Sequence, residues 1–122
     1  MTRVLNFAAV AILLGLSPRL DAQVQLVEIS NVQVASSLSA LVQDHVGYPI
    51  PNVVVEEFSS DWKKVLREIT TDSAGKFSLA PVPGRKLYYL QLSAYGFNPL
   101  RVRVRVDPKH GKKLTLTLEI AT

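Results

Sequence analysis

The stretch that decides the fold lies within residues 41–84. Residues 41–55 read Leu-Val-Gln-Asp-His-Val-Gly-Tyr-Pro-Ile-Pro-Asn-Val-Val-Val, and residues 70–84 read Thr-Thr-Asp-Ser-Ala-Gly-Lys-Phe-Ser-Leu-Ala-Pro-Val-Pro-Gly. Gly, Pro, Asp and Asn separate short runs of β-branched and aromatic residues, which is the pattern of strands joined by tight turns. The sequence therefore predicts a small all-β domain, and this stretch indicates no reaction.

Runs of the same kind continue to the end of the chain. We predict seven strands, at residues 38–43, 52–59, 65–71, 76–80, 87–93, 100–106 and 114–120. In 100–106 valine alternates with arginine, so one side of this strand is expected to face the core and the other to face solvent. Seven short strands at this spacing predict a β-sandwich. Residues 23–37 alternate less regularly and are expected to form an N-terminal extension or an extra strand.

The first 22 residues have the features of a secretory signal peptide. Arg3 supplies a positive charge, residues 4–16 are apolar apart from Asn6, and Ala22 suits the position before the cleavage site. The apolar run is shorter than the roughly 20 residues of a membrane span, so we favour a cleaved signal over an uncleaved anchor. We expect a protein that is secreted or periplasmic, in a bacterial cell envelope, without stable membrane insertion after cleavage.

Composition limits the remaining possibilities. The 122 residues suggest a single domain, placed here at 38–122. The formal net charge of +4 is modest, and an exported protein rarely meets nucleic acid, so we expect no nucleic-acid partner. There is no Cys, which excludes thiol chemistry and a lipid-modified lipoprotein. The fold must therefore depend on packing and sheet hydrogen bonds rather than on disulfides.

Four segments in order resemble the landmarks of carboxypeptidase regulatory-like domains. They are Val-Gln-Asp-x-x-Gly-x-Pro-Ile-Pro-Asn-Val-x-Val at 42–55, Thr-Asp-Ser-x-Gly-Lys-Phe-Ser-Leu at 71–79, Val-Pro-Gly at 82–84 followed by Leu-Tyr-Tyr-Leu, and Ala-Tyr-Gly-Phe at 94–97. The resemblance implies a transthyretin-like, seven-stranded Greek-key β-sandwich. It also implies an accessory role, beside peptidases, in surface stalks or at outer-membrane receptors. Asn52 departs from the family pattern, because members often have Gly there.

Catalysis is poorly supported by the sequence. His45 and His110 have no carboxylate at a familiar metal-ligand spacing, so we expect solvated loop histidines, no metal and no cofactor. Glu56 and Glu57 are adjacent on a strand and face opposite sides, so they cannot act as a pair. The chain also lacks the Tyr-Arg-Gly-Ser tail of transthyretin-related hydrolases. The protein is therefore expected not to be an enzyme.

Arg101, Arg103 and Arg105 line one face of one predicted strand, and we call them the arginine ladder. The interpretation we favour is a solvated face paired with carboxylates on neighbouring strands. The carboxylates considered for this pairing are Glu56, Glu57, Glu68 and Glu119. The alternative is an anion site for acidic polysaccharide or phosphate, because the guanidinium group binds such groups with two parallel hydrogen bonds.

Trp62 lies at a predicted hairpin tip. An exposed Trp there would stack on sugars or anchor a protein partner, whereas the alternative that we favour has it folded back over the sandwich end. The leading hypothesis is an exported non-enzymatic binding or scaffold module for a protein or a cell-envelope glycan, an acidic glycan included. Its candidate binding residues are Trp62, Arg101, Arg103 and Arg105. The alternative hypothesis is a structural envelope subunit that self-associates through sheet edges.

Overall fold

The computed structural model describes residues 23–122, so the expected signal peptide lies outside the described residues. The strands are β1 (Val27–Glu28), β2 (Gln33–Gln43), β3 (Val54–Phe58), β4 (Val65–Thr70), β5 (Lys76–Ser78), β6 (Leu87–Ser93), β7 (Leu100–Val106) and β8 (Lys112–Thr117). Residues 23–122 contain no helix, and therefore none that could span a membrane. The all-β prediction is confirmed, with eight strands in place of seven.

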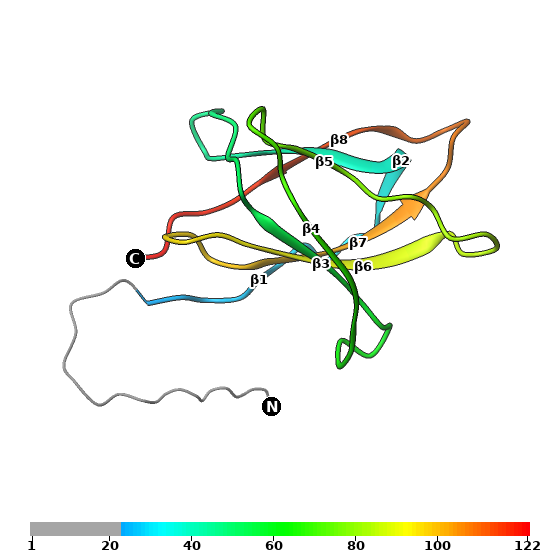
Figure 1. Cartoon of the computed structure of the whole chain (residues 1–122), viewed down its shortest axis with the longest axis horizontal. Coiled ribbons are helices and arrows are strands. Elements are labelled where there is room, and N and C mark those ends of the chain that lie inside the picture. Colours follow the sequence, from blue (N-terminus) through cyan, green and yellow to red (C-terminus); the bar gives the residue numbers. More distant parts are fainter. Residues whose placement is uncertain (1–22) are drawn as a thin grey trace.

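The strands form one curled sheet that folds over itself at β2 (Figure 1). The order is β4-β3-β6-β7-β2-β5, with β1 added to β7 and β8 added to β2, both in parallel. The first part of β2 pairs with β7, at Gln33–Ala35. Its second part runs between β5 and β8. A single strand thus belongs to both layers, and this makes the sheet a sandwich.

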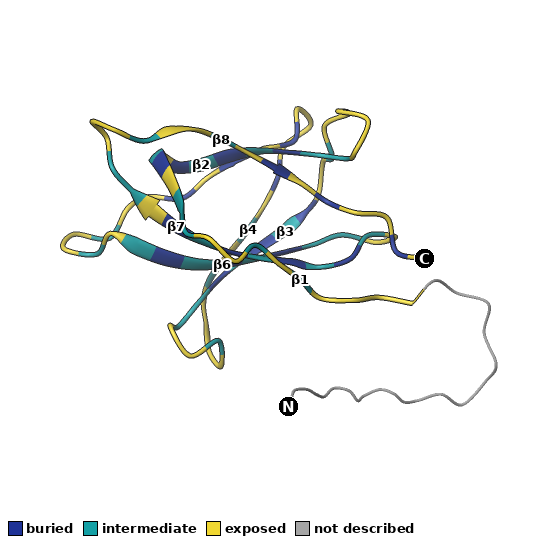
Figure 2. Cartoon of the chain, turned by 180° about the vertical axis from the view of Figure 1, so that it is seen from behind, coloured by how far each residue is buried: buried dark blue, intermediate teal, exposed yellow. Residues whose placement is uncertain are grey.

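Burial alternates along the central strands (Figure 2). In β7, Val102 and Val104 are buried while the arginines between them are half-buried or exposed, as the alternation predicted. In β6, Tyr88 is buried and Tyr89 faces outward. The enclosed core consists of aliphatic side chains from both layers together with Phe77 and Tyr88.

The ends of the chain differ most from the predicted strands. The predicted strand 38–43 is the second half of a longer β2, because residues 33–35 pair with β7 as well. The last strand runs from Lys112 to Thr117 rather than over 114–120, because Ile120 turns away to form an isolated bridge with Phe97. The strands Leu87–Ser93 and Leu100–Val106 agree with their predicted bounds.

The predicted turns form as their residue types require. Asp72 accepts hydrogen bonds from the backbone N–H groups of Ala74 and Lys76, both at 2.9 Å. Gly75 has φ +77°, and a Cβ there would lie 2.8 Å from the carbonyl oxygen of Val42, so a side chain would be both strained and crowded. Asn52, where the family often has Gly, also has a positive φ of 61°, a conformation that Asn tolerates better than most residues.

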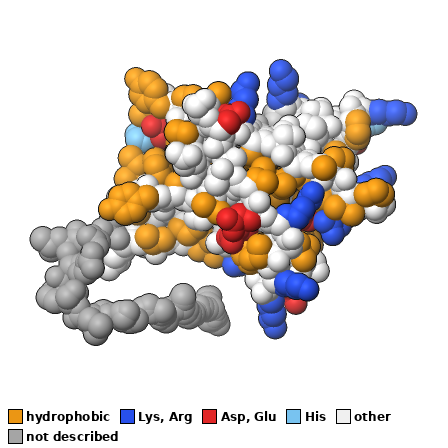
Figure 3. All heavy atoms as spheres, in the orientation of Figure 1, with side chains coloured by type: hydrophobic (Ala, Val, Ile, Leu, Met, Phe, Trp, Pro, Cys, Tyr) orange, Lys and Arg blue, Asp and Glu red, His pale blue; other side chains and the backbone are white. Residues whose placement is uncertain are grey.

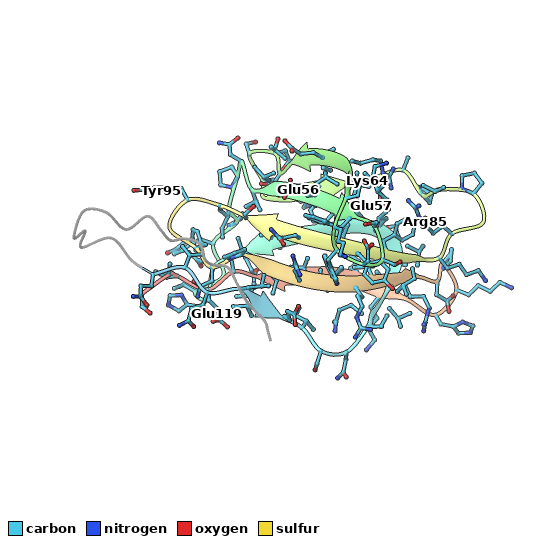
Figure 4. The ribbon with its side chains drawn as sticks, turned by 90° about the horizontal axis from the view of Figure 1, so that it is seen from below. Glu56, Glu57, Lys64, Arg85, Tyr95 and Glu119 are labelled. Carbon is cyan, nitrogen blue, oxygen red and sulfur yellow. The ribbon has the colours of Figure 1, made fainter. Side chains whose placement is uncertain are left out.

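Glu57 is a buried carboxylate on the core-facing side of β3. Its side chain is 1% exposed and accepts hydrogen bonds from Arg67 of β4 at 2.6 Å and from Arg85 at 2.5 Å. Arg67 also donates to the carbonyl of Ala80 at 2.7 Å, and the Arg85 guanidinium lies 5.1 Å from the ring centroid of Tyr88. The carboxylate therefore holds the loop before β6 against β4 (Figure 4).

The Glu57→Gln variant is expected to lose about 3 kcal/mol of unfolding free energy, because both guanidinium groups lose their buried counter-charge. Urea unfolding monitored by fluorescence measures the difference. Glu56→Gln is the matched control, since Glu56 lies on the opposite face of β3 and opposite Glu68 in the cross-strand register. The control is expected to change stability by less than about 0.5 kcal/mol. Equal losses in the two variants would contradict this role for Glu57.

Candidate functional site

A groove on the outer face of the sheet brings together most of the residues that the sequence singled out. It has a volume of about 410 Å³ and is lined by Glu28, Ile29, Ser30, Trp62, Tyr89, Arg101, Val102 and Arg103. These residues come from β1 and the segment after it, the β3–β4 hairpin tip, β6 and β7. We call it the Trp62 groove. Trp62, Arg101 and Arg103 therefore lie together, whereas Arg105 lies outside the groove.

Strand register explains why these side chains meet. In the antiparallel pairing of β6 with β7, Tyr89 lies opposite Arg103 and Gln91 lies opposite Arg101. Phe58 of β3 lies opposite Tyr89 on the other side of β6. All of these positions point away from the core because their neighbours along each strand are buried. The outer face consequently carries an aromatic row beside a cationic one.

From the sequence we favour a Trp62 side chain that folds back over the sandwich end. In the structure it packs on this outer face instead. Its ring lies 5.6 Å from Phe58 and 5.5 Å from Tyr89 between centroids, the latter edge-to-face. The side chain remains half-buried. The hairpin bends back because Trp62 has φ 63° and donates its N–H to the carbonyl of Ser59 at 2.9 Å. A positive φ at a bulky residue is costly, so the surrounding contacts must hold it.

Asp61 stabilises the hairpin tip next to Trp62. Its carboxylate accepts a hydrogen bond from the Ser59 hydroxyl at 2.6 Å and another from the Lys63 N–H at 3.0 Å. The hydrogen bond from Ser59, followed by that from Lys63, holds the pKa of Asp61 below its ordinary value of 3.8. The ionised carboxylate is therefore the form that the tip favours.

Arg101 is held in one orientation by three side chains. Its guanidinium lies 4.5 Å from the Trp62 ring centroid and 5.8 Å from that of Phe58, and its Nε donates to Gln91 Oε1 at 2.8 Å. Burial lowers the pKa of Arg101 below its ordinary value, and the charge of Glu28 opposes that change. A guanidinium that has lost part of its hydration gains more from meeting an anion than one in open water does.

The rest of the arginine ladder is placed differently. Arg103 donates from Nη2 to the backbone carbonyl of Ser30, at the side of the groove formed by the segment after β1. Arg105 is exposed, opposite Leu87 in the register. The expected pairing with carboxylates is not found: within residues 23–122 no ladder arginine forms an ion pair, and Glu57, one of the carboxylates considered, pairs with Arg67 and Arg85 instead.

The sequence analysis did not identify the other five lining residues of the groove, among which Tyr89, Glu28 and Ser30 carry polar groups. The signal for Tyr89 was present, because alternation placed Tyr88 and Tyr89 on opposite faces and one of them therefore had to face outward. Glu28 and Ser30 lie in the irregular segment 23–37, whose placement beside β7 no periodicity indicated.

The remaining polar side chains offer little chemistry. His45 and His110 are exposed, and Nδ1 of His110 lies 3.2 Å from the carboxylate of Asp107 in its own loop. Within residues 23–122 no three His, Cys, Asp or Glu side chains are grouped so as to hold a metal ion. The groove can therefore bind through two cations, one carboxylate and two aromatic rings.

Comparison with known proteins agrees with this architecture. The family model of the carboxypeptidase regulatory-like domain matches residues 37–119, more than two thirds of the chain. The match runs from within β2 past the end of β8, so it covers the strands of both layers except β1. It confirms the expected transthyretin-like β-sandwich. A search of curated proteins found no match.

The contribution of Asp61 to the hairpin tip is expected to depend on pH. Because folding lowers its pKa, that contribution is present above pH 3.8 and is lost as the pH falls through the lowered value. Trp62 is the only Trp in the chain, so its emission spectrum between pH 7 and pH 2 reports the change. We expect an acid step in the wild type that Asp61→Asn lacks and that Asp107→Asn, altered in another loop, retains. If the Asp61→Asn variant keeps the acid step in Trp62 emission, another titrating group must cause it.

Proposed function

We propose that this chain, which belongs to the carboxypeptidase regulatory-like domain family, is an exported binding module that holds an acidic cell-envelope glycan in the Trp62 groove. The domains of this family are non-catalytic. The observation that carries the proposal is the pair of guanidinium groups, Arg101 and Arg103, fixed beside an aromatic pair in one open groove. The ligand is a saccharide that bears carboxylate groups.

Charge and pre-organisation favour an anionic ligand. Arg101 and Arg103 outnumber Glu28 in the groove, and both guanidinium groups are already oriented by contacts within the protein. Little side-chain entropy is then lost when an anion binds. Each guanidinium has donors left over, since Arg presents five N–H groups and these contacts use few of them. A carboxylate can therefore form charge-assisted hydrogen bonds without displacing the existing ones.

Shape and composition favour a sugar over a protein segment. A volume of about 410 Å³ lies at the lower end of the range for small-ligand sites, about 300–1,000 Å³, and suits one or two sugar rings. Trp62 and Tyr89 line the groove and offer apolar contact to the C–H groups of a pyranose, while Glu28 and the Ser30 carbonyl can accept hydrogen bonds from hydroxyl groups. Protein anchors usually fill deeper and drier pockets.

The alternative of self-association through sheet edges receives less support. The edge strand β4 exposes Val65 and Leu66, at 44% and 41%, and these would favour edge pairing. However, the β3–β4 pairing shifts register between Glu57 and Phe58, and Lys63 and Lys64 stand at the start of β4. Bulges and lysines at an edge oppose strand addition. We therefore favour the groove as the functional surface.

Binding is expected to be selective for charged oligosaccharides. A galacturonic acid oligosaccharide of defined length, titrated against the protein with Trp62 fluorescence as the signal, should bind, and a glucose oligosaccharide of equal length should not. Arg103→Gln should weaken binding at least about tenfold, because a hydrogen bond to a charged group contributes about 1.5–3 kcal/mol. Added salt should weaken binding in the wild type.

Arg105→Gln is the matched control, because it removes the same charge from the same strand outside the groove. It is expected to change the affinity less than about twofold, since the screened charge acts only at a distance. Equal losses of affinity in the Arg103→Gln and Arg105→Gln variants would show that net charge, and not the groove, determines binding. Binding of the neutral oligosaccharide with equal affinity would contradict the proposal that the ligand must carry carboxylate groups.

Export is tested separately from binding. Expression of the full chain in a secreting bacterial host is expected to yield protein outside the cytoplasm whose N-terminal residue is Gln23, because Ala22 suits the cleavage site. Intact mass and N-terminal sequencing identify that terminus. Recovery of protein that still begins at Met1 in the membrane fraction would support an anchor instead.

A further inference from the structure

The exposed large hydrophobic side chains of this protein gather at one end of the sandwich. Of nine such residues within 23–122, the three on strands, Val34, Val65 and Leu66, lie elsewhere. The other six belong to loops and terminal segments, and we call them the apolar end: Val24, Leu26, Val46, Tyr48, Tyr95 and Ile120. Figure 3 shows hydrophobic side chains crowded at the left, where the described chain begins. Such a concentration is unusual for a surface that stays in water.

Backbone hydrogen bonds bring these segments together. The N–H of Gln25 donates to the Asn98 side chain at 2.9 Å, and the N–H of Ala121 donates to the carbonyl of Gly96 at 3.0 Å. The N–H of Leu118 donates to the carbonyl of Gln43, next to the loop that contains Val46 and Tyr48. The apolar end is therefore built from four segments that lie at the same end of the sandwich, namely residues 23–26, 44–48, 94–98 and 118–122.

The surface has a hollow with a projecting ring beside it. The hollow has a volume of about 640 Å³, and its apolar lining includes Val24, Val54, Phe97 and Pro99. Tyr95, at its rim, is 103% exposed and points away from the rest of the chain (Figure 4). A ring beside a hollow of this kind is self-complementary, because a second copy related by a two-fold axis can place its ring in the facing hollow.

The charges of this end do not favour a membrane as the partner. Its four segments contain no Lys or Arg, and their carboxylates are Asp44 and Glu119. Asp44 is engaged by the backbone N–H groups of Tyr48, Val46 and Gly47, which hold its pKa below 3.8. An anionic bilayer attracts basic segments, which this end lacks. A second copy of the same apolar end, which also lacks basic residues, is a better match.

We propose that two copies of this chain associate end to end through the apolar end, in a two-fold symmetric dimer. Whole aromatic side chains bury about 150–250 Å² each, so Tyr48 and Tyr95 together offer roughly 350 Å² at their observed exposure. That is close to half of the roughly 800 Å² that each partner contributes to a standard interface. The four aliphatic side chains of the apolar end enlarge the area further.

The dimer would leave the Trp62 groove open. No residue that lines the groove belongs to the apolar end, and the two surfaces are built from different segments. Dimerisation and glycan binding are thus separable properties, and either can fail without the other. The inference does not depend on the proposed ligand of the groove.

Sedimentation velocity of the protein purified after expression of the full chain tests the dimer, at concentrations from about 1 to 200 μM. We expect a reversible monomer–dimer equilibrium in the wild type. Tyr95→Ser should weaken it at least about tenfold, because each substitution acts twice across a two-fold axis. Val46→Ser provides a second variant in another loop. Both side chains are exposed, so thermal unfolding should remain close to that of the wild type.

Leu66→Ser is the matched control, since it removes an exposed side chain from the β4 edge. It should leave the dimer unchanged, and a dimer that Leu66→Ser dissociates but Tyr95→Ser does not would indicate edge pairing and overturn the proposal. A wild type that stays monomeric at 200 μM would also overturn it. So would co-sedimentation with phosphatidylcholine vesicles that Tyr95→Ser abolishes, because the apolar end would then dock on lipid.

Discussion

The fold depends on one strand that belongs to both layers. β2 pairs with β7 through its first residues and lies between β5 and β8 through its last, so its course decides how the sheet closes on itself. The backbone is closely packed at this bend. Gly111, which precedes β8, has no room for a Cβ, because that atom would overlap the carbonyl of Ala35 in β2. Because β7 is held on one side by β2 and on the other by β6, its outward arginines stand in a fixed frame. The site therefore inherits its rigidity from the core.

Two groups of arginines in this protein differ in burial and in what their guanidinium groups contact. Glu57 is enclosed, and the two arginines that neutralise it tie a loop to the sheet. A paired charge at such depth specifies the local packing and offers nothing to a ligand. Arg101 and Arg103 are held by an aromatic ring, a side-chain amide and a backbone carbonyl instead. These partners orient the guanidinium groups, and neither guanidinium forms an ion pair with a carboxylate within residues 23–122.

Alternation and turn chemistry were sufficient to predict most of the fold. The strands Leu87–Ser93 and Leu100–Val106 were predictable because period two is strong there, and the turn at Asp72 because its residues permit few other conformations. β1 was not, since two residues added to the edge of β7 leave no periodic signal. The partners of the arginine ladder were not predictable either. They depend on the cross-strand register and on the buried position of Glu57, which are tertiary properties.

A polymeric ligand would connect the roles proposed for the Trp62 groove and for the apolar end. One groove of about 410 Å³ contacts only a few sugar units, and exposed charge pairs add little affinity individually. Two grooves fixed in one dimer would meet the same chain of sugars, and the second contact then forms at a high effective concentration. The gain requires that the two grooves keep a fixed separation, and β1, which pairs with β7 and carries Glu28, directly follows segment 23–26 of the apolar end. The proposed dimer would thus give a small domain higher avidity for the proposed polymer without a larger binding site.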